Sequence, residues 1–487
     1  MFKLSLVASA AVLPLLIAAN VVNADSSIST AGGGSIGLAS GSAPASYGPF
    51  PITLSGYDGD KTNSVSYTGQ IARHALEQSL KKIAAMGDGG ANAAELEAQM
   101  LAYFDGADQD RPIIAPVSKD GYPILQTTVD EISSGKNISG KFYGGLMPAW
   151  PGNMTGKDVA YHMIRMAAQS EGGFDAENGY DWAQLISKFT MGAMAYNQAV
   201  DNYLDEKLLA DNKPNNKPYK DGAYYTGKEH SWDEGFGYWG CAAHCLSLTA
   251  DEIYSIAKQK GFDLADADGD GVVDLKSEHV FGPAYYAAAF DRSGTKTTSY
   301  THNIMSAYID GRQLITDAAG EALSDEQRST LQGYAATIAS NWEQVLAEAV
   351  FKYAGSVYKD IEKMKTLDGD ELTSAYRSYA KHWGELMGFS MALQSGKNNL
   401  GAVAVELNSL IGYGPVTLDK SYVTGVDGDG NFVRERRRGW RDYQLHMLKV
   451  QKLMVDTFGV ESRVNDGLAT LEELSDALYN ESNAETD

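Results

Sequence analysis

Apolar residues at helical spacing are the feature that most limits what this 487-residue chain can fold into. Side chains three or four positions apart lie on the same face of an α-helix. The clearest apolar stripe runs from Trp182 to Leu204, and a second runs from Trp342 to Met364. Alternation with a period of two, which is typical of strands, is scarce. The pattern therefore predicts an all-α fold.

The same spacing predicts further helices, at residues 67–86, 93–103, 159–169, 232–246, 299–319, 372–393, 444–458 and 471–479. Three short patterns recur in the same order in the two halves of the chain. Ser-Tyr-Thr begins at residues 66 and 299, Trp-x-Gln at 182 and 342, and His-x-x-acid at 230 and 382. This order predicts two pseudo-repeated helical bundles. We place the first bundle, with an insertion, at residues 51–250, an acidic connection at 251–296 and the second bundle at 297–487.

The first residues have the pattern of a targeting segment. Lys3 precedes the apolar run Leu4–Ala19, and small residues precede Asp25. The run is too short for a transmembrane helix and predicts a secretory signal peptide over residues 1–24. Residues 25–50 are rich in Ser, Gly and Ala, which predicts a flexible linker. No later apolar run reaches the roughly 18 residues that span a bilayer. We therefore expect a periplasmic, secreted or cell-surface protein.

The chain carries a formal net charge of -23 at pH 7. Such a chain repels the phosphates of nucleic acids and attracts cations. We therefore expect no nucleic-acid partner. The expected partners are a metal ion or a metal complex, with an envelope uptake protein as a further candidate.

His230, Asp233 and Glu234 form the first motif with the chemistry of a metal site. On a helix, positions i, i+3 and i+4 share one face. Imidazole and carboxylate ligands together suit zinc, iron or manganese. The simpler interpretation, which the pattern by itself favours, is a helix start with an exposed acidic turn and a locally hydrogen-bonded histidine.

His382 and Glu385 form the second motif. His382 lies on the apolar stripe of its helix, where a histidine is more often a core residue than a ligand, and Glu385 follows one turn later. Because the two motifs occupy matching places in the two halves, we consider a single site that would combine them around iron or zinc. His–metal bonds are only ~2 Å long, so such a site requires both histidines close together.

Residues 266–278 contain a third motif. Asp266, Asp268, Asp270 and Asp274 occupy loop positions 1, 3, 5 and 9, with a glycine at position 6. This spacing is typical of calcium-binding loops, although the twelfth position is a serine and Glu278 comes one residue later. We expect a structural Ca²⁺ site. The alternative is an acidic, solvated loop.

Cys241 and Cys245 are the only cysteines. If both lie on the predicted helix, their separation is near the upper limit that a disulfide tolerates. We therefore favour buried free thiols over a bridge. The chain also lacks a Gly-rich phosphate loop, a Gly-x-Ser-x-Gly elbow and a His-Glu-x-x-His zinc helix, so the sequence leans against an enzyme.

Several of these segments together resemble a known bacterial family. The segments 180–186, 229–240 and 382–389 look like domain of unknown function 4856, and the acidic loop 268–278 also fits it. That family is similar to the imelysins, which pair two helical bundles and carry a Gly-x-His-x-x-Glu motif. His382 and Glu385 match its His-x-x-Glu part, while Ala380 stands where the motif has glycine. The resemblance implies an imelysin-like fold and a role in iron or haem uptake at the bacterial envelope.

The function that we favour from the sequence is an exported metal-handling or binding protein, acting in iron or haem acquisition. One alternative is a metal-dependent hydrolase, namely a peptidase, with Glu234 or Glu385 as general base. Another is a calcium-stabilised interaction module without catalysis.

Overall fold

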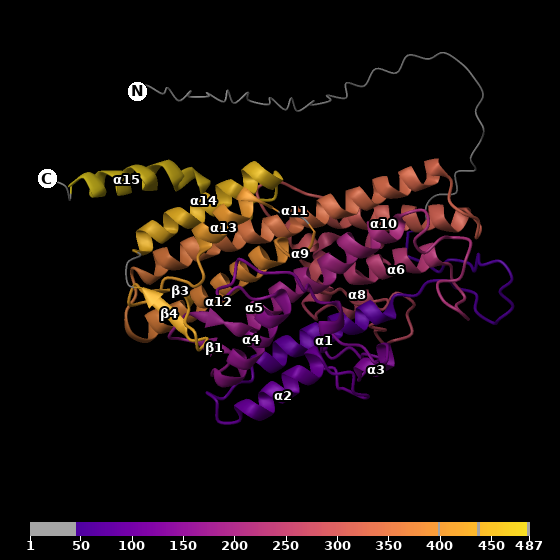
Figure 1. Ribbon diagram of the computed structural model, residues 1–487, viewed down its shortest axis with the longest axis horizontal. Coiled ribbons are helices and arrows are strands. Elements are labelled where there is room, and N and C mark those ends of the chain that lie inside the picture. The colour runs from indigo at the N-terminus through magenta and orange to yellow at the C-terminus, as the bar shows by residue number, and fades with distance from the viewer. Residues whose placement is uncertain (1–44, 398–399, 436–438, 485–487) are drawn as a thin grey trace, which may run out of the picture. The chain divides into compact units, whose positions relative to one another are not determined.

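The computed structural model describes residues 45–397, 400–435 and 439–484, the last four of these by their backbone only. Within these ranges the chain forms fifteen α-helices and two short two-stranded sheets, which confirms the all-α prediction (Figure 1). None of the described helices combines the length and apolar composition that a membrane crossing requires. The predicted signal peptide and most of the predicted linker lie outside the described residues.

The helices and strands follow one another in two series. Up to residue 265 they are α1 (Thr68–Ala84), α2 (Ala93–Phe104), α3 (Val129–Ile132), η1 (Ser139–Lys141), α4 (Gly156–Gln169), β1 (Phe174–Asp175), β2 (Tyr180–Asp181), α5 (Trp182–Thr190), η2 (Met191–Tyr203), η3 (Glu206–Leu208), α6 (Gly227–Trp239), η4 (Cys245–Ser247), α7 (Ala250–Ala257) and α8 (Phe262–Ala265). After it they are α9 (Gly282–Asp291), α10 (Tyr300–Asp317), α11 (Asp325–Met364), α12 (Gly369–Leu393), α13 (Ala402–Ile411), β3 (Tyr422–Val426), β4 (Phe432–Glu435), α14 (Trp440–Phe458), η5 (Leu468–Thr470) and α15 (Leu471–Ala484).

Helix α11 is the longest element, with 40 residues, and it packs along α10, α12 and α14 (Figure 1). Elements from the two halves of the chain are in direct contact. Helix α12 packs against α5, and α10 packs against α6. One continuous core of apolar side chains therefore runs through both halves. The division into two pseudo-repeated bundles stays a prediction.

The stripe predicted as one helix from 182 to 204 divides into α5 and a 13-residue π-helix, η2. Helix η2 approaches α12 very closely at Gly192, where a Cβ atom would come within 2.3 Å of the backbone of Ala392. A side chain at this position would push the two elements apart. Apolar spacing locates the buried face of such a segment but does not distinguish α from π hydrogen bonding.

The two cysteines form a disulfide, so the prediction of free thiols was wrong. That prediction assumed one helix over residues 232–246, but α6 ends at Trp239. Gly240 adopts the left-handed conformation, with φ of +73°, and ends the helix as glycine commonly does. The chain then turns, and the Cα atoms of Cys241 and Cys245 lie 6.2 Å apart, within bridging range.

The packed structure begins before residue 51, inside the predicted linker. Tyr47 and Phe50 are both buried, and the Tyr47 hydroxyl donates a hydrogen bond to Asp233. The linker prediction is therefore wrong for this short stretch. Composition suggested a linker because Ser, Gly and Ala dominate residues 25–46, but two aromatic rings anchor its end.

A buried arginine connects this N-terminal stretch with both halves of the chain. Arg312 of α10 is fully buried, and its Nε lies 2.9 Å from Asp233 of α6. One of its terminal nitrogens lies 3.4 Å from Glu229, and the other donates to the Ser64 hydroxyl. Such charges are tolerated in a core only when they are paired.

Replacing Arg312 should be strongly destabilising. Arg312→Met leaves Asp233 and Glu229 buried without their cation, so we expect the free energy of unfolding to fall by about 3–5 kcal/mol. Urea denaturation measures this change. Lys452→Gln is the control, because it removes an exposed ion pair with Asp456 and should cost about 0–1 kcal/mol. Equal losses in the two variants would contradict the assigned role of Arg312.

Candidate ligand-binding cavity and metal sites

The first predicted motif lies on α6, which begins with a capping box. The Thr226 side chain accepts from the backbone of Glu229, whose carboxylate in turn accepts from the backbone of Thr226. His230 follows and packs between the rings of Tyr219 and Tyr225, with ring centroids 4.3 and 4.4 Å away. Its aromatic surroundings leave the ring little contact with water.

His230 and Glu234 face each other, whereas Asp233 does not join them. The Nε2 atom of His230 lies 3.8 Å from a carboxylate oxygen of Glu234, and Nδ1 has no hydrogen-bond partner. Burial lowers the pKa of His230 to about 3 and raises the pKa of Glu234. Asp233 accepts hydrogen bonds from Tyr47, Arg312 and the Ser66 backbone, and these contacts give it a structural role.

The second predicted motif lies on α12 in different surroundings. The Nδ1 atom of His382 lies 2.6 Å from an oxygen of Asp360 on α11, and Glu385 is buried one turn away. Among the described residues, these side chains do not form a cluster of ligand atoms with His230 or Glu234. The hypothesis of one shared site is therefore not supported. Helix α6 packs on α1, α10 and η2, and α12 packs on α5, α11 and also on η2, so the two helices share one neighbour.

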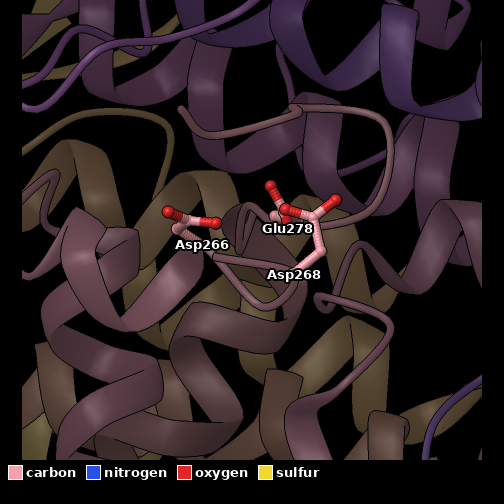
Figure 2. Close-up of side chains that lie close together, drawn as sticks. All are labelled: Asp266, Asp268 and Glu278. Carbon is pink, nitrogen blue, oxygen red and sulfur yellow. The ribbon is translucent and has the colours of Figure 1, made fainter. Parts of the chain in front are cut away.

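The acidic loop does bring three carboxylates together, as Figure 2 shows. Ligand oxygens of Asp266, Asp268 and Glu278 all lie within 4.8 Å of one another. Glu278, which comes one residue later than the usual calcium pattern, joins the cluster. Asp270 and Asp274 are not part of this cluster, and Asp274 accepts hydrogen bonds from Gln126 and from the backbone of the loop.

A large cavity opens between α1, α5, α7, α9, α11 and α12, with a volume of about 740 Å³. His382 and Glu385 both line it, so one of the two predicted motifs belongs to a cavity wall. Aromatic side chains form much of the remaining wall, namely those of Tyr254, Tyr285, Tyr286, Tyr353 and Phe281.

The cavity wall is basic although the chain is acidic overall. Its basic residues are Lys81, Lys82, Lys119, Lys188, Lys258, Lys352, Arg377 and Lys381, against the three carboxylates Glu77, Asp181 and Glu385. Arg377 is paired with Asp181 at 3.1 Å. Among the described residues, none of the seven lysines has a carboxylate oxygen within 4.0 Å. The cavity therefore concentrates positive charge that the protein itself does not neutralise.

The pKa values of two wall lysines reflect the repulsion between neighbouring positive charges in the cavity. Partial burial lowers the pKa of Lys119, and the charges of Lys82 and Lys258 lower it further. Burial likewise lowers the pKa of Lys352, where the charge of Glu385 opposes the shift and that of Lys258 adds to it. Crowding of like charges disfavours the charged form. An anion in the cavity would relieve this repulsion.

Sequence reasoning missed the cavity because its lysines come from four separate helices and two connecting segments. Each is an ordinary surface residue by pattern. The exception is Lys188, which lies between Leu185 and Phe189 in the most apolar stretch of the first half. A lysine inside such a stripe was the one available signal of an unusual site.

The described residues form a helical protein with a basic cavity that tyrosine side chains line. Residues 158–266 match the family described as domain of unknown function (DUF4856), which confirms the predicted resemblance for this part of the chain. The matched part covers α4 to α8 and includes the His230 motif, but not His382. No curated protein and no solved structure matches the chain.

The burial of His230 predicts a pH dependence of stability. Its folded pKa of about 3 lies below the ordinary value of 6.5, so between these pH values the unfolded chain binds a proton that the folded chain does not. The free energy of unfolding should therefore fall on acidification, by about 1.4 kcal/mol per pH unit from this group.

Denaturation at pH 5.5 and 4.5 tests this expectation. His230→Gln should make the pH dependence of the free energy of unfolding shallower by that amount, because the variant has no group to protonate at position 230. His302→Gln, on the exposed face of α10, is the control and should leave the dependence unchanged. A variant at position 230 with the wild-type slope would show that the buried ring does not stay neutral.

Proposed function

We propose that this chain is a binding protein that holds an anionic metal complex, a haem or a ferric chelate, in its basic cavity. The observation that carries the proposal is the set of seven wall lysines without a carboxylate partner, in a chain of net charge -23. Unpaired cations that line one cavity favour a ligand with carboxylate or similar groups. The volume of about 740 Å³ suits a ligand of drug-like size.

His382 supports a metal in that ligand. A metal-binding imidazole usually donates its other ring N–H to a carboxylate, which fixes the ring orientation. The short contact between Nδ1 and Asp360 has this form, and it leaves Nε2 available. We propose Nε2 of His382 as the metal ligand, with the wall lysines contacting the acidic groups of the complex.

A role in iron or haem acquisition at the bacterial envelope follows as the biological part of this proposal. The predicted signal peptide and the resemblance to imelysins support this role. A peptidase that uses Glu385 as general base and a calcium-stabilised interaction module stay as alternative predictions.

Titration with hemin tests the proposal. We expect binding that Lys81→Gln/Lys258→Gln weakens about tenfold, because two cations leave the wall. His382→Ala should change the absorption spectrum of bound hemin, because it removes a ligand of the iron. Lys452→Gln, outside the cavity, is the matched control and should behave as wild type.

Metal-free protoporphyrin separates the two parts of the proposal. It keeps the carboxylates, so its affinity should depend on the two lysines but not on His382. Hemin affinity that is unchanged in the double lysine variant would overturn the anion site. A hemin spectrum that is identical with and without His382 would overturn the metal ligand.

Calcium binding at residues 266–278 stays a prediction from the sequence. The cluster of Asp266, Asp268 and Glu278 narrows the proposed ligands to these three carboxylates. A bound ion raises the free energy of unfolding by about 1.4 kcal/mol when its concentration is tenfold above Kd. We expect thermal unfolding in millimolar Ca²⁺ to shift upward relative to EDTA. Glu278→Gln should abolish the shift, while Asp270→Asn should retain most of it. The reverse order would favour the ligand set predicted from spacing.

A further inference from the structure

Lys188 is the most deeply buried of the cavity lysines. It lies on α5, lines the cavity, and is only 3% exposed. Its Nζ makes a long hydrogen bond of 3.4 Å to the Ser187 hydroxyl, and among the described residues no carboxylate oxygen lies within 4.0 Å of it. The ring of Tyr286 lies 5.5 Å away. A charged ammonium at this position would lack both water and a direct counterion.

These surroundings favour the neutral amine. Burial lowers the pKa of Lys188 well below its usual range, and the positive charge of Lys81 lowers it further, while Glu385 and Glu77 act in the opposite direction. Desolvation and a neighbouring cation are the two conditions that make a lysine nucleophilic near neutral pH.

A second buried titratable group, a carboxylate, lines the same cavity. Glu77 of α1 also lines the cavity and is 2% exposed, and its Oε1 atom has no hydrogen-bond partner. Burial raises the pKa of Glu77, which makes this carboxylate a better proton acceptor than an exposed one. The buried end of the cavity therefore combines a nucleophile, a proton carrier and, toward the surface, cations that bind an acidic group.

We propose that Lys188 captures anionic aldehydes or ketones as an imine at the buried end of the cavity. The inference uses the same basic wall as the proposed function, but it does not depend on a metal or on His382. The ligand class is a carbonyl compound that carries a phosphate or carboxylate. The exposed wall lysines contact the acidic group and leave the carbonyl to face Lys188.

The reaction needs no further reactant. The unprotonated Nζ attacks the carbonyl carbon, and the electron pair of the C=O bond moves to oxygen. The nitrogen loses one proton to Glu77, which passes it to the oxygen and gives a carbinolamine. Glu77 then carries the second nitrogen proton to the hydroxyl, which leaves as water while the C=N bond of the imine forms. One water is released for each imine formed, with no change in oxidation state.

Reductive trapping tests the proposal on the full chain. Pyridoxal 5′-phosphate is the probe, because it carries both an aldehyde and a phosphate, and borohydride converts its imine to a stable secondary amine. Peptide mapping by mass spectrometry then locates the adduct. At pH 7 only about 0.04% of an ordinary lysine is unprotonated, so Lys188 should be trapped at least tenfold faster than exposed lysines.

Two neighbouring positions on α1 supply matched variants. Lys81→Gln removes the charge that lowers the pKa of Lys188, so trapping at pH 7 should slow severalfold and its pH midpoint should move upward. Lys82→Gln removes a wall cation that is not among the charges shifting Lys188, and should leave the midpoint unchanged. A merely structural role for Lys81 would not move the midpoint.

Adducts spread over exposed lysines, with the Lys188 peptide unmodified, would overturn the proposal. So would equal trapping in wild type and Lys188→Arg. If that variant does not fold, the peptide map of the wild type still decides. Trapping at Lys188 without hemin binding would reject the proposed function and keep this inference, whereas hemin binding without trapping would do the opposite.

Discussion

The buried guanidinium of Arg312 is the contact on which the arrangement of the helices depends. It pairs with Asp233 and Glu229 of α6 from its own place on α10, and it also holds Ser64 in the N-terminal stretch. Each of these charges would be costly if left alone in the core. Together they set how the two halves of the chain meet. This also explains why Asp233, an attractive metal ligand by spacing, serves the fold instead.

Charged side chains in the cavity are arranged in the opposite way to those around Arg312. The core neutralises its arginine, whereas the cavity gathers seven lysines and leaves them without carboxylate partners. In a chain of net charge -23 this distribution requires a reason, because lysines on the outer surface would find acidic neighbours. The anionic ligand that we propose would supply that reason. The same crowding and burial that make the wall receptive to anions also favour the neutral amine of Lys188.

Much of the helical architecture could be predicted, because a stripe such as Trp342 to Met364 needs only local spacing to define its buried face. Ends of elements were less predictable. Helix α6 ends before Gly240, so Cys241 and Cys245 lie beyond it and not on the predicted helix, and they form a bridge there. The candidate site was predictable only in pieces. His382 and Glu385 were selected for their types and spacing, but their role in a cavity wall depends on helices far away in sequence.

The sequence by itself determined the all-α class and the buried face of most helices, since these depend on side-chain periodicity within one segment. It also located the acidic loop, whose carboxylates are close in the chain. The tertiary structure alone decided which charges meet. It separated the His230 and His382 motifs, paired Arg312 with Asp233, and assembled lysines from distant helices around one space. Electrostatic interactions act through space between segments, so residue order does not specify them.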